Sequence, residues 1–244
     1  MKIFIDSANL IEIEAALKRG FISGITTNPS LLSKEPRTSF SGHIHKIIDL
    51  INRYRPGLHL SVEVFSRDRD EMLRQAQDFI KEFNYPAMSI KVQIGWDELE
   101  TIAALSKMGI SVNCTACMTV SQGMMAAQAG ARYVSLFWGR IRDGGTDENN
   151  TTNREKLVSA RVLDQKDFDP AFVVSSVRQG IERAGLNAEI IAGSIRGVVD
   201  IRDAAAAGAH IVTVPPKFFL PMASHYKTDE VGEQFLSDFK AWMH

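Results

Sequence analysis

The sequence has only two cysteines, almost no net charge and no long uninterrupted run of apolar residues. Its 244 residues include 28 Lys and Arg against 29 Asp and Glu, a formal net charge of −1 at pH 7. Proteins that bind nucleic-acid phosphates normally carry a basic face or stripe. Charged residues interrupt every candidate membrane span, and Asp6 precedes any apolar region of a signal peptide. We therefore expect a cytoplasmic protein with a small-molecule partner, and neither nucleic-acid nor membrane binding.

The two cysteines, Cys114 and Cys117, form a C-x-x-C motif. This motif is found in redox pairs and in zinc sites. A structural zinc site needs two further ligands, and the six histidines show no metal-ligand spacing around the motif. We interpret the pair as two reduced thiols in or near a core strand, and we expect no metal site.

Short apolar runs alternate with amphipathic segments along the whole chain, as expected for parallel β-α units. Eight such units close a barrel, and 200 to 250 residues is a common length for one barrel domain. The chain lacks the Gly-rich turn that follows the first strand in nucleotide-binding open sheets. The sequence therefore predicts a single α/β domain over residues 1–244, a (β/α)₈ TIM barrel. The expected strands are 2–7, 24–28, 58–65, 87–94, 109–115, 133–138, 189–195 and 210–215.

Two segments depart from this regular spacing. Residues 140–153 are rich in Gly, Asn, Asp and Thr, which predicts a loop after the sixth strand. Residues 229–243 place apolar side chains at helical spacing, which predicts an extra C-terminal helix that covers the barrel or docks on a neighbouring subunit.

Polar residues recur on the expected strands, where a packed interior should be apolar. Residues two apart on a strand point to the same side, so polar pairs such as Thr26 with Asn28 can face the barrel axis together. We predict one polar cluster at the carboxyl ends of the strands. Its members are Asp6, Thr26, Asn28, Glu63, Lys91, Asn113, Thr115, Ser135 and Ser194.

Lys91 lies within the apolar strand 87–94 and defines the chemistry of this cluster. Partial burial lowers the pKa of an ammonium and yields an amine that can attack a carbonyl. The resulting protonated imine withdraws electrons, so a ketose can be cleaved without a metal. Asp6 and Glu63 can then divide the roles of base and acid. A structural salt bridge from Lys91 to Asp6 or Glu63 is the alternative.

A second group of residues has the chemistry of an anion site. Arg140 follows the sixth strand, and Ser194 and Arg196 follow the seventh. Barrels frequently bind phosphate near their last strands, where a hydroxyl, backbone N–H groups and a guanidinium act as donors. Two separate surface arginines are the alternative. Together with the Lys91 cluster, the group indicates a sugar that carries a terminal anion.

Several motifs stand in the order and spacing of a known family. They are FIDSAN at 4–9, GITTNPSLL at 24–32, SIKV at 89–92, GARYVSLFWGRI at 130–141 and AGSIRG at 192–197. The chain resembles the short transaldolases, the group that includes bacterial fructose-6-phosphate aldolase. The resemblance covers nearly the whole chain and implies a TIM barrel that needs no cofactor.

The resemblance also implies a role for each matching residue. Lys91 forms the Schiff base with a dihydroxyacetone unit, and Asp6 takes the proton of the C4 hydroxyl. Glu63 and Thr115 position a catalytic water. Asn28, Asn113 and Ser135 hold the dihydroxyacetone hydroxyls with Thr26 nearby, and Arg140, Ser194 and Arg196 bind phosphate. The family implies a ring-like homo-oligomer, often a decamer, with the C-terminal helix on a neighbour.

Two positions separate transfer from simple aldol cleavage. Glu63 and Phe137 match transaldolases, whereas the aldolases have glutamine and tyrosine there. Leu136 and Trp138 depart from the Pro and Val usual in the family, and we expect them to alter the wall of the anion site. The sequence thus predicts a transaldolase acting on fructose 6-phosphate or sedoheptulose 7-phosphate. An aldolase that releases dihydroxyacetone, a transaldolase for another C6 anion such as 6-deoxy-6-sulfofructose, and a non-catalytic sugar-phosphate binding barrel are the alternatives.

Overall fold

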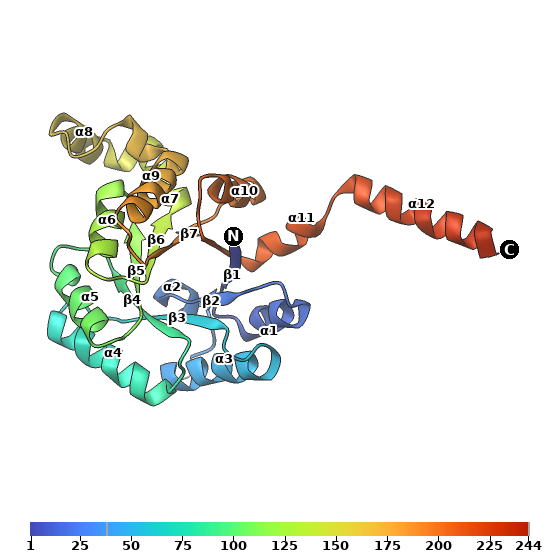
Figure 1. Cartoon of the computed structure of the whole chain (residues 1–244), viewed down its shortest axis with the longest axis horizontal. Helices are drawn as coiled ribbons and strands as arrows, with labels where there is room; N and C mark the ends of the chain where they lie inside the picture. Colours follow the sequence, from blue (N-terminus) through green and yellow to red (C-terminus); the bar gives the residue numbers. More distant parts are fainter. Residues whose placement is uncertain (38, 244) are drawn as a thin grey trace.

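A computed structural model describes residues 1–37 and 39–243 and shows a closed barrel of eight parallel strands (Figure 1). The strands are β1 (Lys2–Asp6), β2 (Gly24–Thr26), β3 (His59–Glu63), β4 (Met88–Gln93), β5 (Val112–Cys117), β6 (Tyr133–Phe137), β7 (Glu189–Gly193) and β8 (Ile211–Val214). Each strand pairs with the next in the sequence, and β8 pairs with β1 to close the barrel. The predicted TIM barrel is confirmed.

Helices surround the barrel and connect its strands (Figure 1). They are α1 (Leu10–Arg19), α2 (Pro29–Leu32), α3 (Phe40–Tyr54), α4 (Arg69–Phe83), α5 (Glu98–Lys107), α6 (Val120–Gln128), α7 (Trp138–Thr146), α8 (Thr151–Ser159), α9 (Pro170–Arg183), α10 (Val198–Ala206), α11 (Phe219–Ala223) and α12 (Tyr226–Met243). Short 3₁₀ helices lie at Glu148–Asn150, Gln165–Phe168 and Pro216–Phe218.

Helix α3 illustrates how the outer layer forms. Ile44, Ile47 and Ile51 are spaced three and four residues apart, so they share one face of the helix, and all three are buried. The Ser39 hydroxyl accepts a hydrogen bond from the Gly42 N–H at 3.1 Å, which caps the first turn. The apolar stripe therefore fixes which face of α3 packs on the barrel.

The register of neighbouring strands determines which polar side chains lie beside one another in the barrel. Glu63 on β3 is paired with Lys91 on β4, and Lys91 is paired with Asn113 on β5. Paired residues of parallel strands point to the same side of the sheet, so these three side chains meet inside the barrel. Residues that alternate with them, such as Ile90 and Val92, are fully buried in the hydrophobic core.

The prediction of a loop over residues 140–153 is wrong, because most of this segment is helical. It contains the greater part of α7, a 3₁₀ turn and the start of α8. Gly144 and Gly145 lie beside Phe168, and a Cβ atom at Gly145 would lie only 3.0 Å from the Phe168 side chain. The Arg154 guanidinium donates to the carbonyls of Gly144 and Asp147 at 3.2 and 3.0 Å. Residues typical of loops thus form short helices that are held by side-chain contacts.

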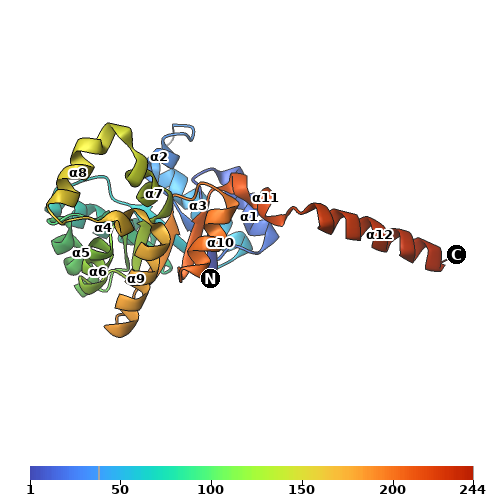
Figure 2. The same ribbon diagram turned by 90° about the horizontal axis from the view of Figure 1, so that it is seen from above.

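The predicted C-terminal helix is confirmed as α12, which begins at Tyr226 rather than Asp229. It extends away from the barrel in both ribbon views (Figures 1 and 2), and none of its residues is buried. It therefore does not cover the barrel, which was one of its two predicted roles. Within the described ranges, no helix has both the length and the apolarity needed to cross a membrane.

Candidate active site

A cavity of about 810 Å³ opens at the carboxyl ends of the strands. Most of the predicted site residues line it, together with Thr213 on β8 and the lysines Lys34 and Lys217, which were not predicted. The predicted residues on its wall are Asp6, Thr26, Asn28, Glu63, Lys91, Thr115, Ser135, Phe137, Arg140, Ser194 and Arg196. The barrel thus brings together residues that are far apart in the sequence.

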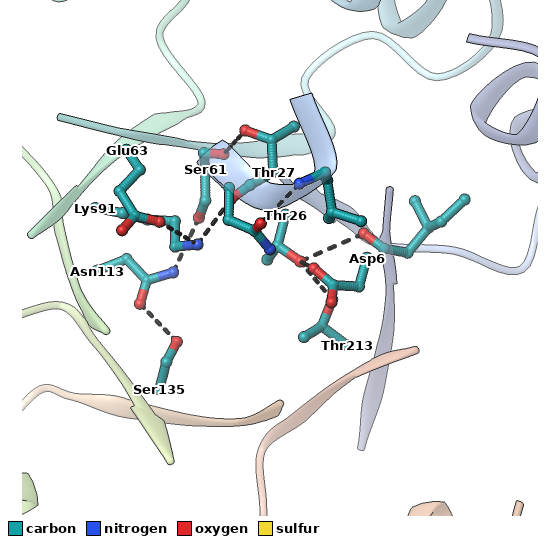
Figure 3. A network of polar contacts seen from close by, with 12 residues as sticks. Asp6, Thr26, Thr27, Ser61, Glu63, Lys91, Asn113, Ser135 and Thr213 are labelled. Carbon is teal, nitrogen blue, oxygen red and sulfur yellow. Dashed lines mark hydrogen bonds and ion pairs between the residues drawn. The ribbon is translucent and has the colours of Figure 1, made fainter. Parts of the chain in front are cut away.

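Lys91 lies at the base of this cavity and is only 5% exposed. Its Nζ donates to the Thr27 carbonyl at 2.7 Å and forms an ion pair with Glu63 Oε2 at 3.0 Å (Figure 3). The salt bridge considered for Lys91 is therefore present, and its partner is Glu63. Both members of this ion pair line the cavity.

Asp6 faces the same cavity from the end of β1. Burial raises the pKa of its carboxyl group above the usual 3.8, although the nearby Lys91 and a hydrogen bond from Thr26 lower it. Thr26 Oγ1 donates to Asp6 Oδ1 at 2.8 Å and lies 2.6 Å from Thr213 Oγ1. The Thr26 hydrogen bond thus fixes the position of the Asp6 carboxylate, which binds a proton more tightly than the carboxylate of an exposed aspartate.

Thr213 was missed because it stands alone in an apolar strand, 211–214. Its position on the expected strand 210–215 was its signal in the sequence. Ser61 was missed in the same way, although it lies two residues before Glu63 and therefore on the same side of β3.

Asn113 and Ser135 form a connected layer at the base of the site. Ser135 Oγ donates to Asn113 Oδ1 at 2.7 Å, and Asn113 Nδ2 donates to Ser61 Oγ at 3.1 Å (Figure 3). Ser135 lines the cavity, whereas Asn113 is fully buried beside it. Asn113 therefore lies behind the cavity wall rather than on it.

The TTNPS motif places Asn28 at the cavity by starting a helix. Asn28 Oδ1 accepts a hydrogen bond from the Leu31 N–H at 3.0 Å, and Pro29 occupies the first position of α2. Both are favoured choices at a helix start. The cap fixes the carboxamide oxygen, so the Asn28 side chain is held at the cavity wall in one orientation.

Phe137 and Trp138 occupy different environments. Phe137 ends β6 and lines the cavity beside Gly193, its partner on β7. Trp138 is only 3% exposed and belongs to the hydrophobic core. Leu136 is also buried in the core. Leu136 and Trp138 thus pack behind the cavity wall, and Trp138, predicted as a substrate-binding residue, does not line the cavity itself.

Arg140, Ser194 and Arg196 meet at the cavity mouth, as the sequence predicts. Arg196 Nη2 pairs with Asp143 Oδ2 at 3.0 Å, and both side chains are about half exposed. The Arg196 backbone N–H donates to Asp200 Oδ2 at 2.9 Å. The cationic side chains thus lie close to the loop of residues 194–197, between β7 and α10, whose shape is fixed by hydrogen bonds.

Gly139 sets the shape of this loop. Its N–H donates to the Ser194 carbonyl at 3.1 Å, and a Cβ atom at Gly139 would lie 2.3 Å from that carbonyl oxygen. Ser194 itself has φ of 58°, a left-handed conformation that is uncommon for residues other than glycine. The close approach of Gly139 therefore supports a strained backbone at the mouth of the cavity.

Cys114 and Cys117 are free, buried thiols on β5, with Sγ atoms 3.8 Å apart. This placement agrees with their interpretation as thiols in a core strand. No group of three or more His, Cys, Asp or Glu side chains is positioned to hold a metal ion in residues 1–37 and 39–243.

The fold and the cavity define a class of protein, the (β/α)₈ barrels with a lysine and two carboxylates at the carboxyl ends of their strands. Residues 3–244 match the model of the family described as transaldolase/fructose-6-phosphate aldolase, and the chain belongs to this family. A probable transaldolase of Carboxydothermus hydrogenoformans is 34% identical over 241 residues and covers 99% of both chains. A probable transaldolase 2 of Listeria monocytogenes is 34% identical over 242 residues, 99% of this chain and 97% of its own. A probable transaldolase of Alkaliphilus metalliredigens is 35% identical over 240 residues, 98% of each.

The raised pKa of Asp6 predicts an effect on stability. Between pH 3.8 and the raised native value, the folded state binds more protons at Asp6 than the unfolded state does, so stability falls as pH rises through this range. Replacing Asp6 with Asn removes this cost. We expect Asp6→Asn to raise the melting temperature at pH 7 and to lose this advantage below about pH 4, as measured by thermal unfolding across pH. An equal difference at pH 3 and pH 7 would contradict the prediction.

Proposed function

We propose that this protein is a transaldolase that transfers a dihydroxyacetone unit from a ketose phosphate to an aldose acceptor through a Schiff base on Lys91. The observation that carries the proposal is the contact of Lys91 with Glu63 and the Thr27 carbonyl on the wall of a cavity that also contains Asp6. A lysine, a proton acceptor beside it and a second carboxylate are the groups that this chemistry needs.

Glu63 supports the first step. The Lys91 amine must be free of its extra proton to attack the C2 carbonyl, and Glu63 Oε2, 3.0 Å from Nζ, is placed to take that proton. The carbinolamine then loses water, for which a carboxyl group supplies a proton, and a protonated imine results. Thr115 lines the same cavity and would share the positioning of this water with Glu63.

Asp6 supports the cleavage step. It would take the proton of the C4 hydroxyl as the C3–C4 bond breaks, while the bond's electron pair moves to the imine and forms an enamine. The aldehyde leaves, the enamine attacks an acceptor aldehyde, and Asp6 returns the proton to the new hydroxyl. A base with a raised pKa is better matched to this exchange than an exposed aspartate.

The remaining polar groups would hold the substrate. Asn28, Ser135 and Thr26 surround the space beside Lys91, with Asn113 behind Ser135. The dihydroxyacetone unit presents hydroxyls to such groups. Arg140, Ser194 and Arg196 at the cavity mouth would bind an anion at the far end of the sugar, and a guanidinium is well suited to the oxygens of a phosphate.

Glu63 and Phe137 favour transfer over simple aldol cleavage. Phe137 lines the cavity but has no hydroxyl group to assist protonation of the bound enamine by water. The enamine can then survive until an acceptor aldehyde arrives. An aldolase that releases dihydroxyacetone is the competing activity.

Helix α12 supports a homo-oligomer. Phe235 is 67% and Trp242 79% exposed, and Val231 and Phe239 are also exposed. Apolar groups gathered on one extended helix are unfavourable in water and are typical of an interaction surface. We infer that α12 docks on another copy of the chain.

Borohydride reduction tests the Schiff base. We expect wild-type protein mixed with fructose 6-phosphate and borohydride to gain one reduced dihydroxyacetone unit on the peptide that contains Lys91, as measured by mass spectrometry. Lys91→Met should remain unmodified, and Lys34→Met, which removes another cavity lysine, should still be modified. An unmodified Lys91 peptide during turnover would contradict the proposal. Product formation without an acceptor aldehyde would identify an aldolase instead.

Arg196→Ala tests the anion site. We expect the KM for a phosphorylated ketose to rise about tenfold or more, since a hydrogen bond to a charged group contributes about 1.5–3 kcal/mol. The effect on kcat should be small. Arg202→Ala is the matched control, because Arg202 pairs with Asp203 on the outer helix α10. Equal kinetics of the two variants would show that the phosphate does not bind at Arg196.

A further inference from the structure

A chain of hydrogen bonds runs from the cavity toward the opposite end of the barrel. It continues from Ser135 and Asn113 to Ser61 Oγ, which lies 2.7 Å from His59 Nε2. Ser135 lines the cavity at the carboxyl ends of the strands. His59 begins β3 and lines a separate hollow of about 790 Å³ at the amino ends. Two residues of this hydrogen-bond chain, Ser61 and His59, have no part in the chemistry described so far.

The surroundings of His59 keep its ring neutral. The ring stacks on Phe4 at 5.1 Å between centroids and meets the edge of Tyr133 at 4.7 Å. Burial lowers the pKa of His59 to about 4; Lys2 and Arg132 lower it too, and Glu189 raises it. The Glu189 carboxylate is itself paired with Lys2 and Arg132. At neutral pH the His59 ring therefore has one N–H group and one acceptor nitrogen.

The hydrogen count of Ser61 gives the chain a direction. Ser61 is fully buried and accepts a hydrogen bond from Asn113 Nδ2, and among the described residues His59 Nε2 is the only other hydrogen-bond partner of its Oγ, so the Ser61 hydroxyl donates its hydrogen to Nε2. This arrangement requires that His59 carry its proton on Nδ1. The Asn113 amide is then fixed with its nitrogen toward Ser61 and its oxygen toward Ser135.

The orientation of the Asn113 amide also decides which hydrogen-bonding role Ser135 has toward the cavity. Because Ser135 donates its only hydrogen to Asn113 Oδ1, its oxygen has only lone pairs to offer on the cavity side. A substrate hydroxyl that meets Ser135 must therefore donate. If His59 did not accept from Ser61, the Asn113 amide could turn over, and Ser135 would become a donor instead.

We propose that His59 and Ser61 are positioning residues that hold the Asn113 amide in one orientation and make Ser135 a hydrogen-bond acceptor for a hydroxyl of the bound dihydroxyacetone unit. This inference rests on the proposed function for the identity of the bound unit. The donor and acceptor roles along the hydrogen bonds from Ser135 to His59 do not depend on any bound substrate.

The ring nitrogens of His59 test the direction without any substrate. We expect nitrogen-15 NMR of the wild-type protein at pH 7 to show a protonated Nδ1 and an unprotonated Nε2 that accepts a hydrogen bond. A proton on Nε2 would overturn the inference. This result does not depend on activity, so it decides the inference even if no transaldolase reaction is found.

His59→Phe tests the effect on the reaction. Phenylalanine keeps an aromatic ring between Phe4 and Tyr133 but has no ring nitrogen, so it cannot accept a hydrogen bond from Ser61. We expect the KM for the donor ketose to rise about tenfold, the effect of one lost hydrogen bond with a polar group left unpaired. The KM for the acceptor aldehyde and the melting temperature should change little. His45→Phe is the control, because His45 is an exposed histidine on α3 that packs on Phe83.

A double variant separates positioning from packing. If His59 acts through Ser61, adding His59→Phe to Ser61→Ala should cause no further rise in the donor KM. Independent effects of the two substitutions, or equal losses for donor and acceptor with a lower melting temperature, would overturn the inference. If the wild-type protein forms no adduct with the ketose and transfers nothing, the proposed function fails, and the NMR measurement alone decides the direction of the chain.

Discussion

The site depends on an ion pair between two neighbouring strands, with Lys91 buried and Glu63 partly buried. Lys91 and Glu63 are partners in the register of β3 and β4, and their charged groups are 3.0 Å apart. A charge enclosed in a barrel is costly unless it has a partner and further hydrogen bonds. Glu63 and the Thr27 carbonyl meet this need, so the lysine is held in one position at the cavity wall.

The rest of the interior accommodates this pair. The threonine contacts around Asp6 and the serine contacts around Asn113 give their polar atoms partners on other strands of the barrel. Among the described residues, Thr101 Oγ1 is the single buried side-chain oxygen or nitrogen without a hydrogen-bond partner. A buried polar network that is this fully satisfied is rigid. It can keep reactive groups in place because none of them must move to find a partner.

The sequence predicts much of this arrangement and misses parts that depend on packing. Regular strand spacing predicts the barrel, and the alternation of side chains along strands predicts that Glu63, Lys91 and Asn113 meet. Trp138 illustrates the limit: it follows Phe137 directly, but the chain enters α7 there and buries its indole. Likewise, the composition of residues 140–153 is typical of a loop. The contacts of Arg154 and Phe168 that stabilise the helices there cannot be read from the sequence. His59 has no signal in the sequence, since its role depends on a chain of contacts through three other strand residues.

Exchange of the ketose C2 oxygen tests the Schiff base on Lys91 most directly. Imine formation expels this oxygen as water, and hydrolysis replaces it with an oxygen from the solvent. A ketose labelled with oxygen-18 at C2 should therefore lose its label to the solvent whenever its dihydroxyacetone unit is transferred, and faster than in the absence of protein or with Lys91→Met. Transfer of the unit with the label retained would contradict the account.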